Sequence, residues 1–105
     1  MEQPNLSAIH ELSNGDKTFE EKIFGVIKRE FPEEKARYFS NLEKGEYIKV
    51  AEDVHKLKHK ISILGLEKGY EIATDYEKSL KSGTYDRKEE FEKVLQMITE
   101  YIHTL

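Results

Sequence analysis

A basic run occupies residues 55–60, which read His-Lys-Leu-Lys-His-Lys. Five of these six side chains are cationic or can become so, in a chain whose formal net charge is −4. Like charges three and four residues apart on a helix repel each other modestly, so helix stability gives no reason for this run. A neutral imidazole is a good nucleophile near pH 7, and a lysine beside it could pair with an anionic oxygen. The run therefore suits attack on a phosphoryl group, where positioning and charge neutralisation supply most of the catalysis.

The helix that carries this run is predicted from about Glu46 to Leu64. Its apolar residues recur at steps of 4, 3, 4 and 3, which is the spacing of a bundle helix. These residues are Val50, Val54, Leu57, Ile61 and Leu64. We expect them to form the seam that faces the core and holds the helix rigid.

The direction of the polar side chains follows from a rotation of roughly 100° per residue. His55 points roughly 140° away from the core direction, and Ser62 lies within about 20° of it. Lys58 sits roughly 80° from the core on the same side, and His59 lies roughly opposite the core. We therefore expect His55, Lys58, His59 and Ser62 to form one surface patch, with Ala51 one turn before it.

Apolar residues at helical spacing predict four further helices, over roughly residues 6–12, 16–44, 67–81 and 86–105. Asp16 is an expected N-cap, and Asp86 with Glu89 indicates a variant capping box. Pro32 should either kink the second helix or split it, because proline lacks the N–H and crowds the preceding turn. The expected apolar faces are Phe19, Ile23, Val26, Ile27, Phe31, Ala36, Phe39 and Leu42, then Gly69, Ala73, Tyr76 and Leu80, and finally Phe91, Leu95, Ile98, Ile102 and Leu105.

The connections between these segments are short and carry glycine at positions 15, 45 and 83, as helix ends do. No segment shows the two-residue alternation of a half-buried strand. Successive long helices should therefore be antiparallel neighbours. We expect an all-α fold, an antiparallel up-down four-helix bundle with a short extra N-terminal helix that closes one end. Residues 1–105 should form a single domain.

Composition excludes several classes of function. The net charge of −4 argues against a general nucleic-acid binder, and no aromatic-basic platform for single strands is present. Cysteine is absent, so disulfides, a thiol nucleophile and cysteine-based zinc sites are excluded. No apolar run approaches the ~20 residues that cross a bilayer, and no signal peptide is evident, so we expect a cytoplasmic protein without membrane contact.

A metal site is not expected either. His55 and His59 are an i, i+4 pair that could supply two zinc ligands, but Lys56 occupies the place of the glutamate in H-E-x-x-H and no third ligand is evident. A stand-alone hydrolase also lacks support, because no paired carboxylates or nucleophile–base–acid set stands out at motif spacing.

The residues around His55 resemble a known family. Val54-His55-Lys56-Leu57-Lys58, followed by Leu64-Gly65, is similar to the H-x-L-K-G-x-x-x-x-L-G pattern of histidine-containing phosphotransfer (HPt) domains. These domains are four-helix bundles of two-component phosphorelays, and the expected helix number, order and length also fit. One position departs from the pattern, since His59 stands where the family usually has a small residue, commonly glycine.

The resemblance implies a role for each matching residue. His55 would accept and donate the phosphoryl group, Lys58 would hold the phosphoryl oxygens, and Gly65 would let the following helix pack closely. The chain would act as a phosphohistidine carrier without its own ATP site or kinase activity, and no Gly-rich phosphate loop is present.

The resemblance also implies the partners, which would be response-regulator receiver domains and a hybrid sensor histidine kinase. No cofactor is expected on this chain, because the receiver would bring the acidic pocket and the Mg²⁺. We expect a monomer, since the apolar seam pairs within the bundle. The alternative, which His59 keeps open, is an interaction module that docks on a receiver or kinase without transferring phosphate.

Overall fold

The computed structural model describes residues 2–105, and these residues form five helices and no strands. The helices are α1 (Ser7–Ser13), α2 (Lys17–Glu43), α3 (Tyr47–Ile63), α4 (Glu67–Lys81) and α5 (Lys88–His103). The prediction of an all-α fold is confirmed. The predicted helix bounds agree with the observed ones to within about three residues.

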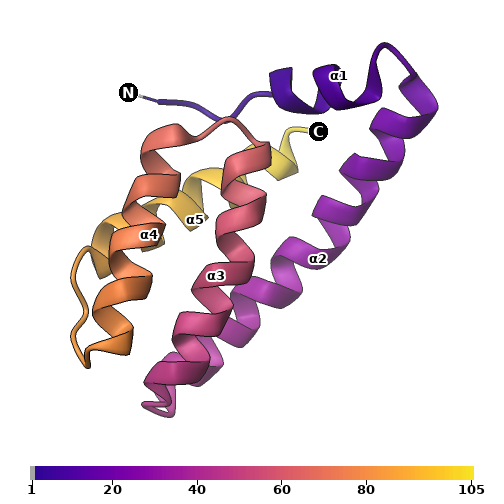
Figure 1. Cartoon of the computed structure of the whole chain (residues 1–105). Coiled ribbons are helices and arrows are strands. Elements are labelled where there is room, and N and C mark those ends of the chain that lie inside the picture. Colours follow the sequence, from indigo (N-terminus) through magenta and orange to yellow (C-terminus); the bar gives the residue numbers. More distant parts are fainter. Residues whose placement is uncertain (1) are drawn as a thin grey trace.

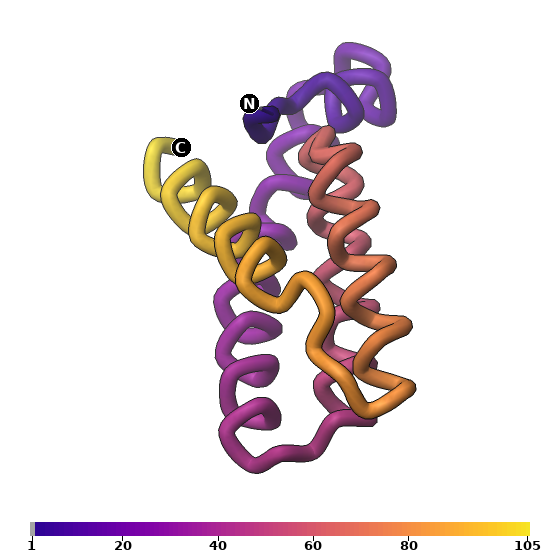
Figure 2. Tube along the Cα trace, turned by 90° about the vertical axis from the view of Figure 1, so that its left-hand side faces the viewer, coloured from indigo at the N-terminus to yellow at the C-terminus, as the bar shows by residue number. Residues whose placement is uncertain are grey.

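The helix α3 lies at the centre of the arrangement, packed against α2 on one side and α4 on the other. Figure 1 shows α2, α3 and α4 running in alternating directions, joined by short turns. Figure 2 shows α5 crossing this group at an angle, so that its C-terminal end diverges from α4. The short helix α1 lies at one end, against the first part of α2.

The core is built mainly from α3, α4 and α5. All five residues of the predicted α3 seam are fully buried, and so are the expected residues of α4. On α5, Phe91, Leu95 and Ile98 are buried as predicted, whereas Ile102 is only partly covered and Leu105 is exposed. Within an antiparallel group of helices, a strict apolar seam is thus a reliable guide to burial.

The predicted apolar face of α2 is wrong over part of its length. Ile27 and Phe31 are buried, but Phe19, Val26 and Phe39 are exposed. The first turns of α2 lie against α1, and a helix of only seven residues covers little surface. Ile23 and Leu42 are partly covered, and Ala36 is exposed.

Tyr38 replaces the exposed Phe39 in the core. Its hydroxyl donates a hydrogen bond to Glu92 Oε2 over 2.8 Å and lies 2.8 Å from the hydroxyl of Tyr76. Burial raises the pKa of Tyr38, and the neighbouring Tyr76 and Glu92 raise it further. Burial also raises the pKa of Tyr76, to about 12. This buried polar network joins α2, α4 and α5.

Helix ends agree with the sequence in part. Asp16 caps α2 as predicted, since its Oδ1 accepts a hydrogen bond from the Phe19 N–H over 3.1 Å. The capping box at Asp86 is wrong, because α5 begins after Arg87, which has a left-handed φ of 66° and makes no side-chain cap. Pro32 neither splits nor ends its helix, which continues from Lys17 to Glu43. The predicted glycine ends at positions 15, 45 and 83 all have positive φ.

The N-terminal segment is fastened across the turn between α3 and α4. The Asn5 N–H donates to the Leu64 carbonyl over 2.8 Å. The Glu2 carboxylate accepts from the N–H groups of Lys68 and Gly69 over 2.9 and 3.1 Å, which caps the first turn of α4. Helix N-termini favour such an anionic partner. The segment therefore holds the N-terminal end of α4.

Gly65, in that turn, has a role that the resemblance did not imply. Its φ is +78°, and a Cβ atom there would lie only 2.5 Å from Asn5 Nδ2. The expectation that Gly65 lets the next helix pack closely is therefore corrected. The close approach of helices occurs at Gly69, where a Cβ would lie 3.1 Å from Ile61 and 3.2 Å from Val94.

Candidate functional site

His55 lies midway along α3 with its side chain turned outward. Its side chain is 53% exposed, while its chain neighbour Val54 and the following Leu57 are fully buried. The buried seam therefore fixes the helix, and the predicted outward direction of the imidazole is confirmed. A rigid helix with an accessible ring nitrogen is the starting point of the site.

A carboxylate from α4 holds one edge of this imidazole. His55 Nδ1 lies 3.2 Å from Glu77 Oε2 and 3.3 Å from Glu77 Oε1. Glu77 is 22 residues from His55 in the sequence, and its side chain is only 11% exposed. Sequence reasoning missed this residue, because periodicity shows that α4 packs beside α3 but does not show which polar residues meet.

Three basic groups surround the Glu77 carboxylate. Lys58 Nζ donates to Oε1 over 3.0 Å, and Lys81 Nζ lies 3.3 Å from Oε2. Burial by itself raises the pKa of Glu77, but hydrogen bonds from Lys58, His55 and Lys81 outweigh it and lower the pKa below its ordinary value. Glu77 is therefore ionised at neutral pH.

The ionised state of Glu77 determines which nitrogen of His55 carries the proton. An ionised carboxylate can only accept hydrogen bonds, so Nδ1 must be the donor. In the neutral imidazole Nε2 then has no proton and keeps its lone pair. A carboxylate in this position also stabilises positive charge on the ring, as it does in catalytic triads. The geometry thus prepares Nε2 as a nucleophile.

Lys58 is near His55 but is already engaged. Its side chain is 12% exposed, its ammonium donates to Glu77, and the ring of Tyr70 lies 5.3 Å from it. The sequence placed Lys58 at the edge of the core, which is where it lies. Its ammonium is held by the carboxylate that also holds His55.

The rest of the predicted patch is brought together in part. His59 and Ser62 are exposed, and the His59 ring lies edge-on to the His55 ring at a centroid distance of 5.1 Å. Ala51 is buried, so it forms the floor of the surface rather than part of its rim.

The end of the basic run faces a different helix. Lys60 Nζ lies 2.8 Å from Glu30 and 3.2 Å from Glu34, both on α2. Burial lowers the pKa of Lys60, but the two carboxylates outweigh it and raise the pKa above its ordinary value. Ion pairs with neighbouring helices account for the partial burial of Lys58 and Lys60. The exposed basic surface of α3 consists of His55, Lys56 and His59.

A shallow, open hollow lies beside the imidazole. Its volume is about 580 Å³, and its lining joins α3 to α4 through Ile48, Ala51, Glu52, His55, Lys56, Glu77 and Lys81. Ile48 is the most exposed large apolar side chain of the described residues, at 62%. The hollow therefore combines an apolar rim with the imidazole and two lysines.

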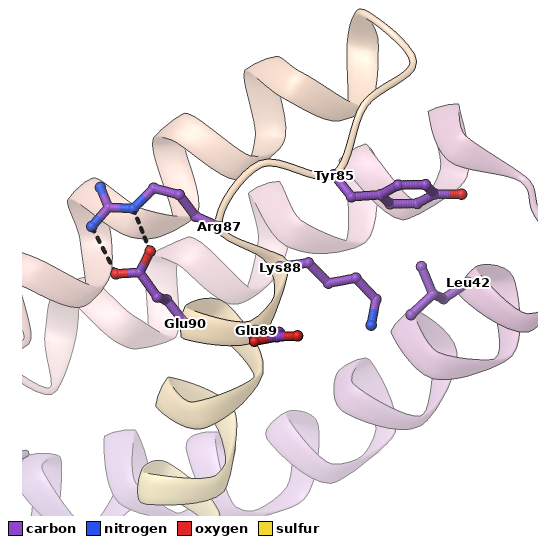
Figure 3. Close-up of a pocket in the computed structure, with 6 residues that line it drawn as sticks. All are labelled: Leu42, Tyr85, Arg87, Lys88, Glu89 and Glu90. Atoms are coloured by element: carbon purple, nitrogen blue, oxygen red, sulfur yellow. Dashed lines mark hydrogen bonds and ion pairs between the residues drawn. The ribbon is translucent and has the colours of Figure 1, made fainter.

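A second hollow of the same volume lies where α5 begins, and Figure 3 shows its lining. Its guanidinium, on Arg87, is bound by Glu90 on one side and by Asp75 on the other. It lacks an imidazole or any other side chain prepared as a nucleophile. Of these two hollows, the one beside His55 is the one that contains an imidazole.

Residues 2–105 contain no group of three or more histidine, cysteine, aspartate or glutamate side chains placed to hold a metal ion. Among the same residues, every helix is too short or too polar to span a bilayer. Comparison of the chain with family models, with curated proteins and with solved structures finds no match in any of the three.

Proposed function

We propose that this chain is a histidine phosphotransfer protein of a two-component phosphorelay. His55 accepts a phosphoryl group from the aspartate of a receiver domain and passes it to the aspartate of another receiver. The observation that carries this proposal is the pairing of an exposed imidazole with an ionised, largely buried carboxylate at its Nδ1 atom. The match of His55, Leu57, Lys58 and Leu64-Gly65 to the HPt pattern supports it.

The transfer step follows from the tautomer of His55. The Nε2 lone pair attacks the phosphorus of the receiver's acyl phosphate in line, and the P–Nε2 bond forms as the P–O bond to the aspartate breaks. The aspartate leaves with the electron pair as a carboxylate. Nδ1 keeps its hydrogen, so the ring gains positive charge, which the Glu77 carboxylate stabilises. The reverse sequence at a second receiver restores the neutral ring.

The partners supply what this chain does not. Receiver domains of response regulators and of a hybrid sensor histidine kinase bring the acidic pocket and Mg²⁺, and the kinase brings the ATP site. The exposed cations of α3, at His55, Lys56 and His59, complement an acidic pocket and should speed the encounter. In this proposal the protein acts as a cytoplasmic monomer, without nucleic acid or membrane.

The finer architecture belongs to the same proposal. The alternating directions of α2, α3 and α4, with α5 packed beside them, support an up-down four-helix bundle, and α1 is the short additional helix. In such a bundle the imidazole stands halfway along a helix, where a flat partner surface can reach it.

The second candidate is an interaction module that docks without transfer. It is favoured by His59, whose ring lies 5.1 Å from the ring of His55 and occupies the position where HPt domains have a small residue. A bulky ring here narrows the approach of a receiver pocket to Nε2. If this ring is what prevents transfer, its removal in His59→Gly leaves docking unchanged and allows the receiver to transfer phosphate to His55.

The test is incubation of the full chain with a radiolabelled, phosphorylated receiver domain from the same genome. We expect acid-labile, alkali-stable label on the wild type and on His59→Gln, and none on His55→Gln. His59→Gln is the matched control, because it removes an exposed imidazole one helical turn away. If every receiver tried binds the wild type but none labels it, the transfer proposal is wrong and the docking module is the better description.

A further inference from the structure

Two lysines share the Glu77 carboxylate, but their environments differ. Lys58 comes from α3, is 12% exposed, and binds Oε1 with the Tyr70 ring beside its ammonium. Lys81 comes from the last turn of α4, is 62% exposed, and binds Oε2 from the i+4 position. One ammonium is therefore enclosed and the other is largely in solvent.

The cost of moving the two ammonium groups differs accordingly. Lys81 is largely exposed, so water can replace its contact with Glu77 and holding its long side chain in place costs entropy. Withdrawal of the enclosed lysine would leave a largely buried carboxylate with fewer partners, which is costly. If Lys81 leaves, Glu77 still accepts from Lys58 and from His55 Nδ1.

The hollow beside the imidazole contains Lys81 but not Lys58. The side chains of His55 and Lys81 both line this space, and both contact Glu77 Oε2. A lysine has four flexible carbons, so its ammonium can move from this oxygen to an anion in the same hollow.

We infer that Lys81, on α4, is the lysine that binds the oxygens of a phosphoryl group on His55, while Lys58 remains on Glu77 as a positioning residue. The inference rests on the proposed function and assigns the phosphoryl contact to a lysine outside the HPt-like motif. Charge neutralisation by a hydrogen-bonded cation favours the phosphorylated state. Lys58 instead holds Glu77 against the imidazole.

Lys56 is the competing cation in the same hollow. It follows His55 directly, so it projects roughly 100° away around the helix. The acid Glu52 lies one turn before it and lines the hollow with it. Lys81, in contrast, already reaches the carboxylate that the imidazole contacts. Substitution of each lysine separates these two possibilities.

The experiment uses phosphoramidate as a small phosphoryl donor, which removes the partner from the measurement. Its P–N bond breaks as the P–Nε2 bond of phospho-His55 forms, and ammonia leaves with a proton from solvent. The full chain is compared with Lys81→Gln, Lys81→Arg, Lys58→Gln and Lys56→Gln. Lys78→Gln is the matched control, because Lys78 is an exposed lysine of α4 that lines a different hollow.

Two quantities are measured for each protein, the rate of phosphorylation and the pKa of the attached phosphoryl group by phosphorus NMR. We expect Lys81→Gln to slow phosphorylation roughly tenfold, the loss expected for one charged hydrogen bond, and to raise the phosphoryl pKa. Lys81→Arg should keep both values near the wild type, and Lys78→Gln should change neither. Lys58→Gln should slow phosphorylation but leave the phosphoryl pKa nearly unchanged.

The outcomes distinguish the inference from the proposed function. If Lys81→Gln behaves like Lys78→Gln, while Lys58→Gln or Lys56→Gln raises the phosphoryl pKa, the inference is overturned and the phosphotransfer proposal stands. If His55 of the wild type takes up no phosphoryl group from phosphoramidate or from any receiver, the proposed function is overturned, and the inference with it. Circular dichroism of each variant confirms that its helices are intact.

Discussion

His55 on α3 and Glu77 on α4 are joined by a contact of 3.2 Å between Nδ1 and Oε2. The two residues are 22 positions apart, and the carboxylate is largely buried while the imidazole is half exposed. In the neutral imidazole this contact places the hydrogen on Nδ1 and leaves the lone pair of Nε2 free for chemistry.

The first prediction concerns the carboxylate itself. Glu77→Gln replaces it by an amide of similar shape, which stabilises positive charge on the ring less well. We expect phosphorylation of His55 to slow by a factor of roughly 10 to 100, as for loss of a charged hydrogen bond. Rates with phosphoramidate measure this effect, and Glu71→Gln on the exposed side of α4 is the control. An unchanged rate in Glu77→Gln would remove the carboxylate from the mechanism.

The second prediction is acid sensitivity from the same residue. The pKa of Glu77 is lowered in the folded chain, so the unfolded state binds a proton more readily. Its stabilising contribution is present above the ordinary value of 4.5 and is lost as pH falls through the lower, folded value. Urea unfolding of wild type and Glu77→Gln should therefore differ most at neutral pH and converge in acid. A gap that widens as pH falls would contradict this sign.

The third prediction is alkaline sensitivity from the buried tyrosines. Burial raises the pKa of Tyr76 to about 12 and also raises that of Tyr38, so ionisation is easier in the unfolded chain. The stabilisation is present below the ordinary value of 10.0 and is lost as pH rises above it. We expect the free energy of unfolding to fall between pH 10 and 12, and to fall less steeply in Tyr38→Phe/Tyr76→Phe. Parallel pH profiles in the two proteins would show that other groups cause the loss.

Tyr38→Phe at neutral pH gives the fourth prediction. It removes the hydroxyl that donates to Glu92 and contacts Tyr76. Glu92 keeps an ion pair with Lys88, so the loss should be moderate, about 1–3 kcal/mol of the free energy of unfolding. Urea denaturation measures it. A loss below about 0.5 kcal/mol would mean that water replaces the hydroxyl at no cost.

The fifth prediction compares two glycines. Gly65→Ala places a Cβ at φ +78° and against Asn5, so it should destabilise the chain by about 1–2 kcal/mol or more. Gly25→Ala, in the middle of α2 with nothing within 4 Å of the added Cβ, should stabilise it by about 0.5–1 kcal/mol. Thermal unfolding measures the change in stability of each variant. If both variants change in the same direction, the different roles given to Gly65 and Gly25 are wrong.

The sequence predicts the helices and the outward-facing imidazole of the site, but not the carboxylate that contacts it. A seam with strict steps of three and four residues determines which face of α3 is buried, and so it also determines that His55 points outward. Glu77 is different, because it gains its role only when α4 is rotated so that this position faces α3. An isolated glutamate on a helix full of charged residues carries no signal of that rotation.

The errors have a similar origin. Phe19 and Val26 continue the apolar pattern of α2 but are exposed, because periodicity carries no information on whether a neighbouring helix covers a given stretch. Lys60 belongs to the basic run in the sequence but pairs with Glu30 and Glu34 across the α2–α3 contact. Adjacent positions on a helix face different partners, so a run of charges need not act as one surface.

The position of Glu2 gives the molecule an unexpected dependence. Its carboxylate accepts a hydrogen bond from the N–H of Lys68, 66 residues later in the first turn of α4, and Glu77 lies farther along that same helix. Cleavage within the first five residues, or a bulky fusion there, would leave the N–H groups of Lys68 and Gly69 without their Glu2 acceptor. It would also displace Asn5 from its place beside Gly65. The segment around Glu2 is thus tied to the same helix that presents Glu77 to His55, so a residue far from the imidazole in the sequence takes part in anchoring α4.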